Sequence, residues 1–568
     1  MEAQRDKGIR RPTRREFLLL FPFAFSYAFF IVLGDWQRSA PYSNLQNMGR
    51  LLLWMLLSYG VLLFICFFLD NRVVLADRGP AAVQMFLRRF LFTGTERQGH
   101  CWIWLVFSLL CLLCYLPYYL MYFPTWFNND AVWQMEQALG LAARSNHHPY
   151  FHTLLMKVFL TVGYGLFGTY TAAVAFYTFF QMALVAAVFG LYLYLLYRRG
   201  TRLLWLALAV VFYAFLPVNG MLSICMGKDA WFTAAFLLFI WAVWGCALAE
   251  AVKKKQWVLF YVTGMAVCLL RSNGIFVFLG TAFCLILSGW CRKVNGISRE
   301  RVHLGRQRML FSVAMVLLSY LLWQGPVLHG LQVEPPDTIE SLAMPTQHLL
   351  CAYVRGGSLT EEEVAMLEAV VPLAEIDEYY NPYLFDMTKN YIREHGDQEV
   401  IAKNRGAYAK LWLRAGLRNP MLYLEAEIRQ TAGYYALHTP HDQYLYTEYY
   451  MVDNPFGIET ERKLFSYDAG LAMSEFLQWF QALYNRVWSL GANTWLLLLC
   501  LAYTLYRRQN ALVYVPCLML LGSLLLATPV YNEFRYAYGV FAALPLLLAY
   551  SFGQKADEKT DREEGTQA

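Results

Sequence analysis

The chain has 568 residues, of which 58% are apolar and 17% aromatic, and its formal net charge is +6 at pH 7. A soluble core of this size cannot bury so much hydrophobic surface, so the composition excludes a soluble globular protein and indicates a polytopic membrane protein. The basic residues stand in short clusters beside hydrophobic runs, as membrane topology signals do. This distribution argues against a nucleic-acid partner.

The hydrophobic runs predict an all-α polytopic membrane protein. A bilayer-spanning helix needs about 20 mostly apolar residues, and we expect about twelve such spans. They are residues 16–36, 50–69, 102–123, 170–197, 203–218, 231–249, 257–271, 274–290, 309–328, 492–506, 512–529 and 534–552. The predicted organisation is a membrane domain over 1–328, an external domain over 329–490, C-terminal transmembrane helices over 491–553 and a disordered cytoplasmic tail over 554–568.

The apolar run at residues 151–167 decides the topology. If it crossed the membrane, the cluster of Arg198, Arg199 and Arg202 would lie outside, against the tendency of basic residues to stay in the cytoplasm. We therefore expect this run to lie on the membrane surface, within a first large external loop at 124–169. Both termini then lie on the cytoplasmic side of the membrane.

The hydrophilic segment at 329–490 lies outside in this topology. Its length of about 160 residues is enough for a domain with its own core. Helical spacing at 361–371, 397–417 and 420–435, with no clear alternating pattern, predicts a mainly helical domain.

The first external loop carries an aspartate and three histidines. A carboxylate and imidazoles at a membrane surface are expensive to keep unless they bind or react with something, so Asp130 is the candidate catalytic residue. The alternative is that Asp130 caps a helix that begins at Ala131. The i, i+4 spacing of His148 and His152 is suitable for a divalent metal ion, although Pro149 indicates that the helix starts there. The alternative is that His147, His148 and His152 are interfacial imidazoles bonded to the loop.

Charged residues also stand at the external ends of later spans. Lys228, Arg271 and Arg535 are candidates for binding a lipid-linked phosphate in a wet recess. The alternative is that these side chains are anchors at the membrane surface. Asp229 and Glu533 lie beside them, and Glu533 with Arg535 has the alternative role of an internal ion pair.

The order of these motifs resembles a known class from about residue 100 onward. The series is an aspartate after an early span, a His-Pro before an apolar surface helix, a Lys-Asp at the start of a later span, an Arg-x-Asn-Gly turn and a late external domain. It resembles the GT-C class of membrane glycosyltransferases, in particular an uncharacterised bacterial family near the protein mannosyltransferases and the aminoarabinose transferases. The external-domain motifs that add to the resemblance are Tyr380-Asn-Pro382 with Asp386 and Lys389, Trp412, Asn419-Pro420 and Thr431-Ala-Gly433-Tyr434-Tyr435.

The resemblance implies a GT-C-like helical bundle and an enzyme. The expected reaction is transfer of a sugar, with inversion, from a polyprenyl-phosphate donor to a cell-envelope glycan, lipid or protein at the outer face of the membrane. Asp130 matches the acidic residue that acts in the first external loop of this class. Many members have paired acidic residues where this chain has Asn128-Asn129-Asp130, which weakens the case for a metal. The alternatives are a transporter or flippase of lipid-linked sugars and a polysaccharide polymerase or ligase.

Overall fold

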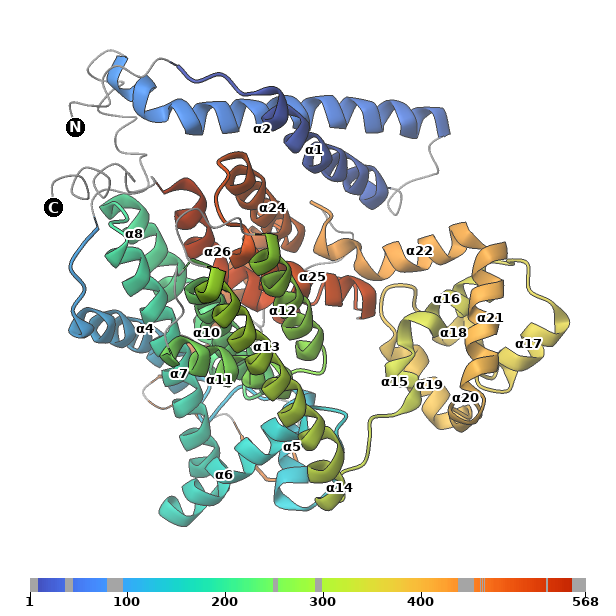
Figure 1. Cartoon of the computed structure of the whole chain (residues 1–568). Helices are drawn as coiled ribbons and strands as arrows, with labels where there is room; N and C mark the ends of the chain where they lie inside the picture. Colours follow the sequence, from blue (N-terminus) through green and yellow to red (C-terminus); the bar gives the residue numbers. More distant parts are fainter. Residues whose placement is uncertain are drawn as a thin grey trace.

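The computed structural model describes residues 9–35, 44–78, 96–248, 254–291, 299–437, 454–459, 461, 463, 465–527 and 530–553. Within these residues the chain forms helices joined by loops, with isolated bridges and no strand longer than a bridge (Figure 1). The prediction of an all-α protein is therefore confirmed for this part of the chain. The tail at 554–568, which we predicted to be disordered, lies outside it.

The helices of the membrane domain follow the hydrophobic runs. They are α1 (Arg14–Asp35), α2 (Asn44–Arg78), α4 (Cys101–Met121), α5 (Asn129–Leu139), α6 (Tyr150–Phe167), α7 (Tyr170–Arg198), α8 (Leu203–Val210), α9 (Pro217–Ile224), α10 (Lys228–Leu248), α11 (Lys254–Leu270), α12 (Gly274–Cys291), α13 (Arg299–Leu322) and α14 (Leu328–Gly330). The C-terminal helices are α23 (Tyr467–Val487), α24 (Leu490–Tyr506), α25 (Val515–Ala527) and α26 (Phe534–Phe552).

The number of spans is smaller than predicted. Among the described residues, seven helices are long and apolar enough to cross a membrane, or up to nine if each of two bent pairs is one span. Every predicted span falls on a helix, but residues 274–288 and 512–527 form shorter apolar helices. Hydrophobicity located the helices, whereas the figure of about twelve spans is not confirmed.

The helix α6 is long and apolar enough to span a membrane, but it packs at one end of the bundle. It begins after Pro149, as predicted, and His152 near its start contacts Tyr177 of α7. At its other end, the ring of Tyr164 lies 4.8 Å from that of Tyr170, the first residue of α7. Both ends of α6 therefore lie beside the first third of α7, an arrangement that suits a surface helix. That α6 does not cross stays a prediction.

Arginines from two of the basic clusters lie at one end of the bundle. The Arg199 guanidinium lies over the ring of Trp244, with Cζ 4.3 Å from the ring centroid, and Arg507 Nη1 donates to the Gly553 carbonyl oxygen at 2.9 Å. Because α10 and α26 reach this end with their last residues, their first residues, Lys228 and Phe534, lie at the opposite end. We call these the arginine end and the polar end. Their separation agrees with the charge-based topology, and which end faces the cytoplasm stays a prediction.

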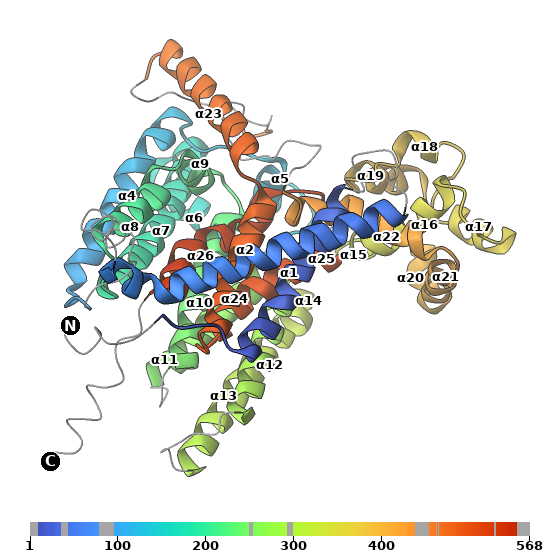
Figure 2. The same ribbon diagram turned by 90° about the horizontal axis from the view of Figure 1, so that it is seen from above.

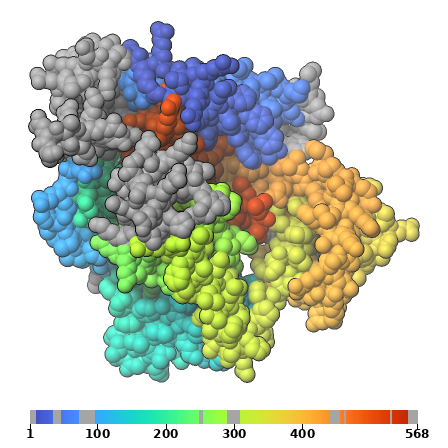
Figure 3. All heavy atoms as spheres, in the orientation of Figure 1, coloured from blue at the N-terminus to red at the C-terminus, as the bar shows by residue number. Residues whose placement is uncertain are grey.

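Residues 338–434 form a helical lobe beside the bundle (Figures 1 and 2). Its helices are α15 (Thr338–Ser341), α16 (Ala343–Val354), α17 (Glu361–Glu368), α18 (Ile376–Tyr379), α19 (Asp386–His395), α20 (Glu399–Lys403), α21 (Arg405–Arg418) and α22 (Pro420–Thr431), followed by a short turn η4 (Ala432–Tyr434). Leu350, Val371, Ile392 and Leu411 belong to its own buried core. The space-filling view shows it as a distinct protrusion (Figure 3). Its position outside the membrane is not tested by the structure.

Candidate functional site

Two short extended segments bring the first external loop to the start of α10. Trp126 and Cys225 form a parallel bridge, in which the Trp126 backbone N–H donates to the Ile224 carbonyl oxygen and the Met226 N–H donates to that of Trp126. The hydroxyl of Thr125 adds a bond to the Ile224 carbonyl oxygen at 2.8 Å. The pairing sets the chain just before α5 beside the chain just before α10. It therefore places Asp130 opposite Lys228.

Asp130 is the centre of an ion cluster at the polar end. Lys228 Nζ and Arg535 Nη1 each lie 3.0 Å from Asp130 Oδ2. Lys228 Nζ also donates to His148 Nδ1 at 3.0 Å, so that the His148 proton is on Nε2, which lies 3.8 Å from Asp130 Oδ1. The structure thus brings one carboxylate, two cations and one imidazole together from four segments of the chain.

A second layer of charges continues the cluster. Asp229 lies between two arginines, with Oδ1 3.6 Å from Arg271 Nη1 and Oδ2 3.8 Å from Arg535 Nη1. Glu533 Oε1 lies 3.5 Å from Arg535 Nε, which is the internal ion pair considered from the sequence. Arg271 Nη1 also donates to the Tyr536 carbonyl oxygen at 3.2 Å. We define the ion cluster as Asp130, His148, Lys228, Asp229, Arg271, Glu533 and Arg535.

Asp130 is not the helix cap that the alternative interpretation required. The N-cap of α5 is Asn128, whose side-chain oxygen accepts from the Ala131 N–H at 2.8 Å. Asp130 lies in the first turn of α5, where its carboxylate is directed at the cations. The cap interpretation was wrong because Asn and Asp are nearly equal caps, and composition alone does not choose between them.

The surroundings keep both Asp130 and His148 in their deprotonated forms. Burial alone raises the pKa of the Asp130 carboxyl, but the charges of Lys228 and Arg535 outweigh burial and hold that pKa well below its usual range. Burial and then the charge of Lys228 lower the pKa of His148 well below its usual range. Asp130 is therefore an anion and His148 a neutral acceptor at pH 7.

The other two histidines have different surroundings. His147 stacks edge-on against His148, with ring centroids 4.6 Å apart, and its Nδ1 lies 3.9 Å from Glu340 of the helical lobe. His152 is fully buried, and its two ring nitrogens bond to the side chains of Gln134 at 3.0 Å and Tyr177 at 2.7 Å. His152 is thus held in the packing between α5, α6 and α7, away from the ion cluster.

The ion cluster is a poor fit for the divalent metal considered from the sequence. Both ring nitrogens of His152 are already bonded, so His148 and His152 do not converge on one point. The carboxylates of Asp130, Asp229 and Glu533 each face a lysine or arginine, whose charge repels a metal ion. In the part of the chain that the structure describes, no group of three or more His, Cys, Asp and Glu side chains is arranged to hold a metal.

Tyr434 is part of a sequence motif named above, but no role at the site was predicted for it. Its hydroxyl is buried and has no hydrogen-bond partner among the described residues. A Cβ on Gly433 would lie 2.2 Å from the Tyr531 carbonyl oxygen, so this glycine lets η4 pack directly against the segment that leads to Glu533. Burial raises the pKa of Tyr434, and the negative charge of Glu533 raises it further. The signal in the sequence was the Gly433-Tyr434 motif.

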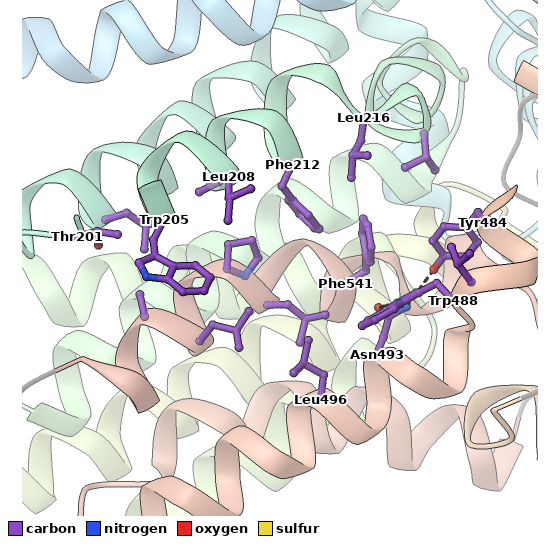
Figure 4. Close-up of a pocket in the computed structure, with 18 of the residues that line it drawn as sticks. Thr201, Trp205, Leu208, Phe212, Leu216, Tyr484, Trp488, Asn493, Leu496 and Phe541 are labelled. Atoms are coloured by element: carbon purple, nitrogen blue, oxygen red, sulfur yellow. Dashed lines mark hydrogen bonds between the residues drawn. The ribbon is translucent and has the colours of Figure 1, made fainter. Parts of the chain in front are cut away.

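An apolar groove lies between α8, α23, α24 and α26 (Figure 4). Its volume is about 410 Å³, and it extends from Thr201 and Trp205 to Tyr484 and Trp488. Nearly all its lining is apolar. The polar groups at the Tyr484 end bond to one another, because Trp488 Nε1 donates to Asn493 Oδ1 at 2.8 Å.

The helix α26 connects this groove to the ion cluster. Arg535 lies in its first turn, while Phe541, Leu544 and Pro545 line the groove. Between them, the ring of Phe534 packs on both Phe541 and Tyr484, with centroids 5.3 and 6.3 Å apart. One helix therefore contributes side chains to both the ion cluster and the apolar groove.

Helices of bilayer length around a charged cluster define the class of this protein as a polytopic helical membrane protein. The family model described as "Family of unknown function (DUF6020)" matches residues 142–566, so the chain belongs to this family. The matched region includes the whole ion cluster except Asp130. No curated protein and no solved structure matches the chain.

Proposed function

We propose that this protein is a GT-C-like membrane glycosyltransferase that transfers a sugar from a polyprenyl-phosphate donor to a cell-envelope acceptor. The observation that carries the proposal is that one helix, α26, contributes Arg535 to the ion cluster and Phe541, Leu544 and Pro545 to the apolar groove. A polyprenyl chain suits the apolar groove, and the donor phosphate suits Lys228 at the start of α10 and Arg535 at the start of α26. The reaction then takes place at the polar end, which the charge-based topology puts at the outer face of the cytoplasmic membrane.

Three cations have the role of binding the donor phosphate. As the bond to the sugar breaks, negative charge accumulates on the departing polyprenyl phosphate, and fixed cations in a partly dehydrated site stabilise it. Lys228, Arg271 and Arg535 are held by Asp130 and Asp229 before the donor binds. The acidic residues thus keep the cations in place and prevent their mutual repulsion.

Asp130 has the role of the general base. Paired to two cations, its carboxylate is a weak base, because its pKa is held well below the usual range. A donor phosphate that takes over Lys228 and Arg535 removes this stabilisation and raises the proton affinity of Asp130. Asp130 then accepts the proton of the acceptor hydroxyl as that oxygen attacks the anomeric carbon, and the sugar–phosphate bond breaks. His148, neutral and bonded to Lys228, helps to orient both.

The substitution Asp130→Asn tests the proposal. It keeps the size of the side chain but removes its proton affinity, so transfer should fall about 100-fold or more while donor binding remains. Sugar transfer from a polyprenyl-phosphate donor to native membrane extract is measured at equal expression. Asp377→Asn, an exposed aspartate of the helical lobe, is the matched control and should transfer normally. Near-normal transfer by Asp130→Asn would remove this residue from the mechanism.

The same groove and cations would suit a flippase of lipid-linked sugars. The groove reaches from the arginine end to the polar end, as a path for a lipid headgroup across the bilayer would. Purified protein in vesicles separates the two functions: a flippase moves the donor lipid between leaflets without making a new glycosidic bond. A polysaccharide polymerase or ligase would instead form that bond only with a lipid-linked glycan as a partner.

A further inference from the structure

The helical lobe contains a cavity that the proposed function does not use. It has a volume of about 470 Å³, within the range of small-ligand sites, and lies between α15, α16, α20 and α21. Buried side chains of Thr346, Leu349 and Ile401 form part of its lining, and Ser341 and Arg405 are exposed at its rim. It is therefore a pocket open to solvent.

Hydroxyl groups in this cavity are free to bind a ligand. Thr338, Ser341 and Thr346 all line it, and none of their hydroxyls makes a hydrogen bond to another group in the described part of the chain. Each hydroxyl supplies one donor and two acceptor positions. Such a set is suited to the hydroxyls of a sugar.

One cation stands at the rim. The guanidinium of Arg405 has no ion-pair partner among the described residues. Arg405 is also the first residue of α21, a helix of 14 residues, so the positive end of the helix dipole adds to its charge. Both features favour a ligand with a negative charge.

The aromatic wall of the cavity is held in a fixed orientation. Trp412 lines the cavity, and its indole Nε1 donates to His348 Nδ1 at 3.2 Å. His348 Nε2 in turn lies 3.2 Å from Glu427 Oε2, and its ring stacks on that of Tyr423 with centroids 4.9 Å apart. Aromatic faces held in this way are suited to stacking on sugar rings.

Side-chain contacts link one wall of the cavity to the ion cluster. The four-residue helix α15 contributes Thr338 and Ser341 to the cavity, and Glu340 between them contacts His147. His147 stacks on His148 of the ion cluster. These contacts connect the wall of the cavity to the ion cluster that contains Asp130.

We infer that this cavity binds an acidic saccharide, a sugar chain that carries carboxylate or phosphate groups. This saccharide is the acceptor whose hydroxyl is presented to Asp130, an assignment that rests on the proposed function. The binding itself is independent of the transfer reaction. An experiment can therefore contradict saccharide binding without contradicting the transfer reaction, and the reverse.

Ligand-detected saturation-transfer NMR on the full-length protein in detergent tests the inference. The probes are a trimer of galacturonate, the neutral trimer of galactose and a trimer of aspartate. The acidic sugar should bind, the neutral sugar about 10-fold or more weakly, and the peptide not at all. Equal binding of the two sugars, or no binding of the acidic sugar, would overturn the inference, and so would equal binding of the peptide.

Two arginines of the same helix provide a matched pair. Arg405→Gln should weaken binding of the galacturonate trimer about 10-fold, whereas Arg414→Gln, at an exposed arginine outside the cavity, should leave it unchanged. Unchanged binding by Arg405→Gln would place the sugar elsewhere. Asp130→Asn should bind the trimer normally. Loss of transfer with normal binding in this variant would therefore concern the proposed reaction and leave the binding inference in place.

Discussion

The carboxylate of Asp130 has two cations within 3.0 Å, and this pairing determines what the residue does before a substrate arrives. A partly buried carboxylate with such partners is a stable anion, and removing one partner would leave an uncompensated charge. Its use as a base requires that another anion replace it at Lys228 and Arg535. In the proposed mechanism the donor phosphate is this anion, whereas a purely structural ion pair would need none.

The neutral state of His148 predicts a pH dependence of stability. Because burial and Lys228 lower its pKa in the folded protein, the unfolded chain binds a proton near pH 6.5 that the folded chain does not. The free energy of unfolding should therefore fall as the pH drops below about 6.5, by up to about 1.4 kcal/mol per pH unit. Thermal unfolding from pH 7.5 to 5 should show a smaller decrease for His148→Gln. The exposed His395→Gln should behave as wild type, and identical slopes for all three proteins would contradict this prediction.

The hydroxyl of Tyr434 predicts a separation of stability from activity. Since it has no partner in the described structure, Tyr434→Phe should leave the melting temperature unchanged or raise it. If the hydroxyl binds the substrate, transfer should fall by about 2- to 10-fold, the value of one neutral hydrogen bond. Tyr538→Phe is the control, because its hydroxyl donates to Asn219 Oδ1 at 2.8 Å and its loss should lower stability. A large loss of stability in Tyr434→Phe would indicate a structural bond instead.

At the scale of elements, the sequence located helices better than it located their partners. The start of α6 at Tyr150 followed from Pro149, whose ring restricts the helix start. The pairing of Trp126 with Cys225 did not follow, because local patterns carry no information about segments about 100 residues apart. The groove was missed for the same reason, since its walls come from α8, α24 and α26.

The contact between η4 and the segment before α26 predicts a specific sensitivity. Gly433→Ala would bring a methyl group to 2.2 Å from the Tyr531 carbonyl oxygen, which is backbone and does not move easily. The free energy of unfolding in detergent should be at least about 1 kcal/mol lower than that of the wild-type protein, a difference typical of overpacking. Gly406→Ala in α21 is the control, because its Cβ would meet nothing within 4 Å and alanine favours the helix. If Gly433→Ala were as stable as Gly406→Ala, the segment before α26 would be able to move away from the added methyl group without loss of stability.

At the scale of the whole molecule, the charge pattern anticipated which residues would meet. Asp130, Lys228, Arg271 and Arg535 were predicted to share one side, and the structure brings them into one connected cluster. Basic residues such as Arg199 and Arg507, at the ends of α7 and α24, lie at the other end of the bundle. The number of spans was less predictable, because short apolar helices within a bundle resemble spans in composition.

The two ends of the bundle predict the topology of the protein in the cell. The arginine end should face the cytoplasm and the polar end the outside, since basic residues near spans are retained in the cytoplasm. Single cysteines at Leu141, exposed in the first loop, and at Arg198, exposed at the end of α7, test this in a variant without its native cysteines. In intact cells, a membrane-impermeant maleimide should label the cysteine at 141 and reach the one at 198 only after the membrane is opened. Labelling of both in intact cells would mean that α6 crosses the bilayer, and labelling of 198 alone would invert the topology and place Asp130 in the cytoplasm. Because the proposed donor is used at the outer face, labelling of 198 alone would also refute the proposed function.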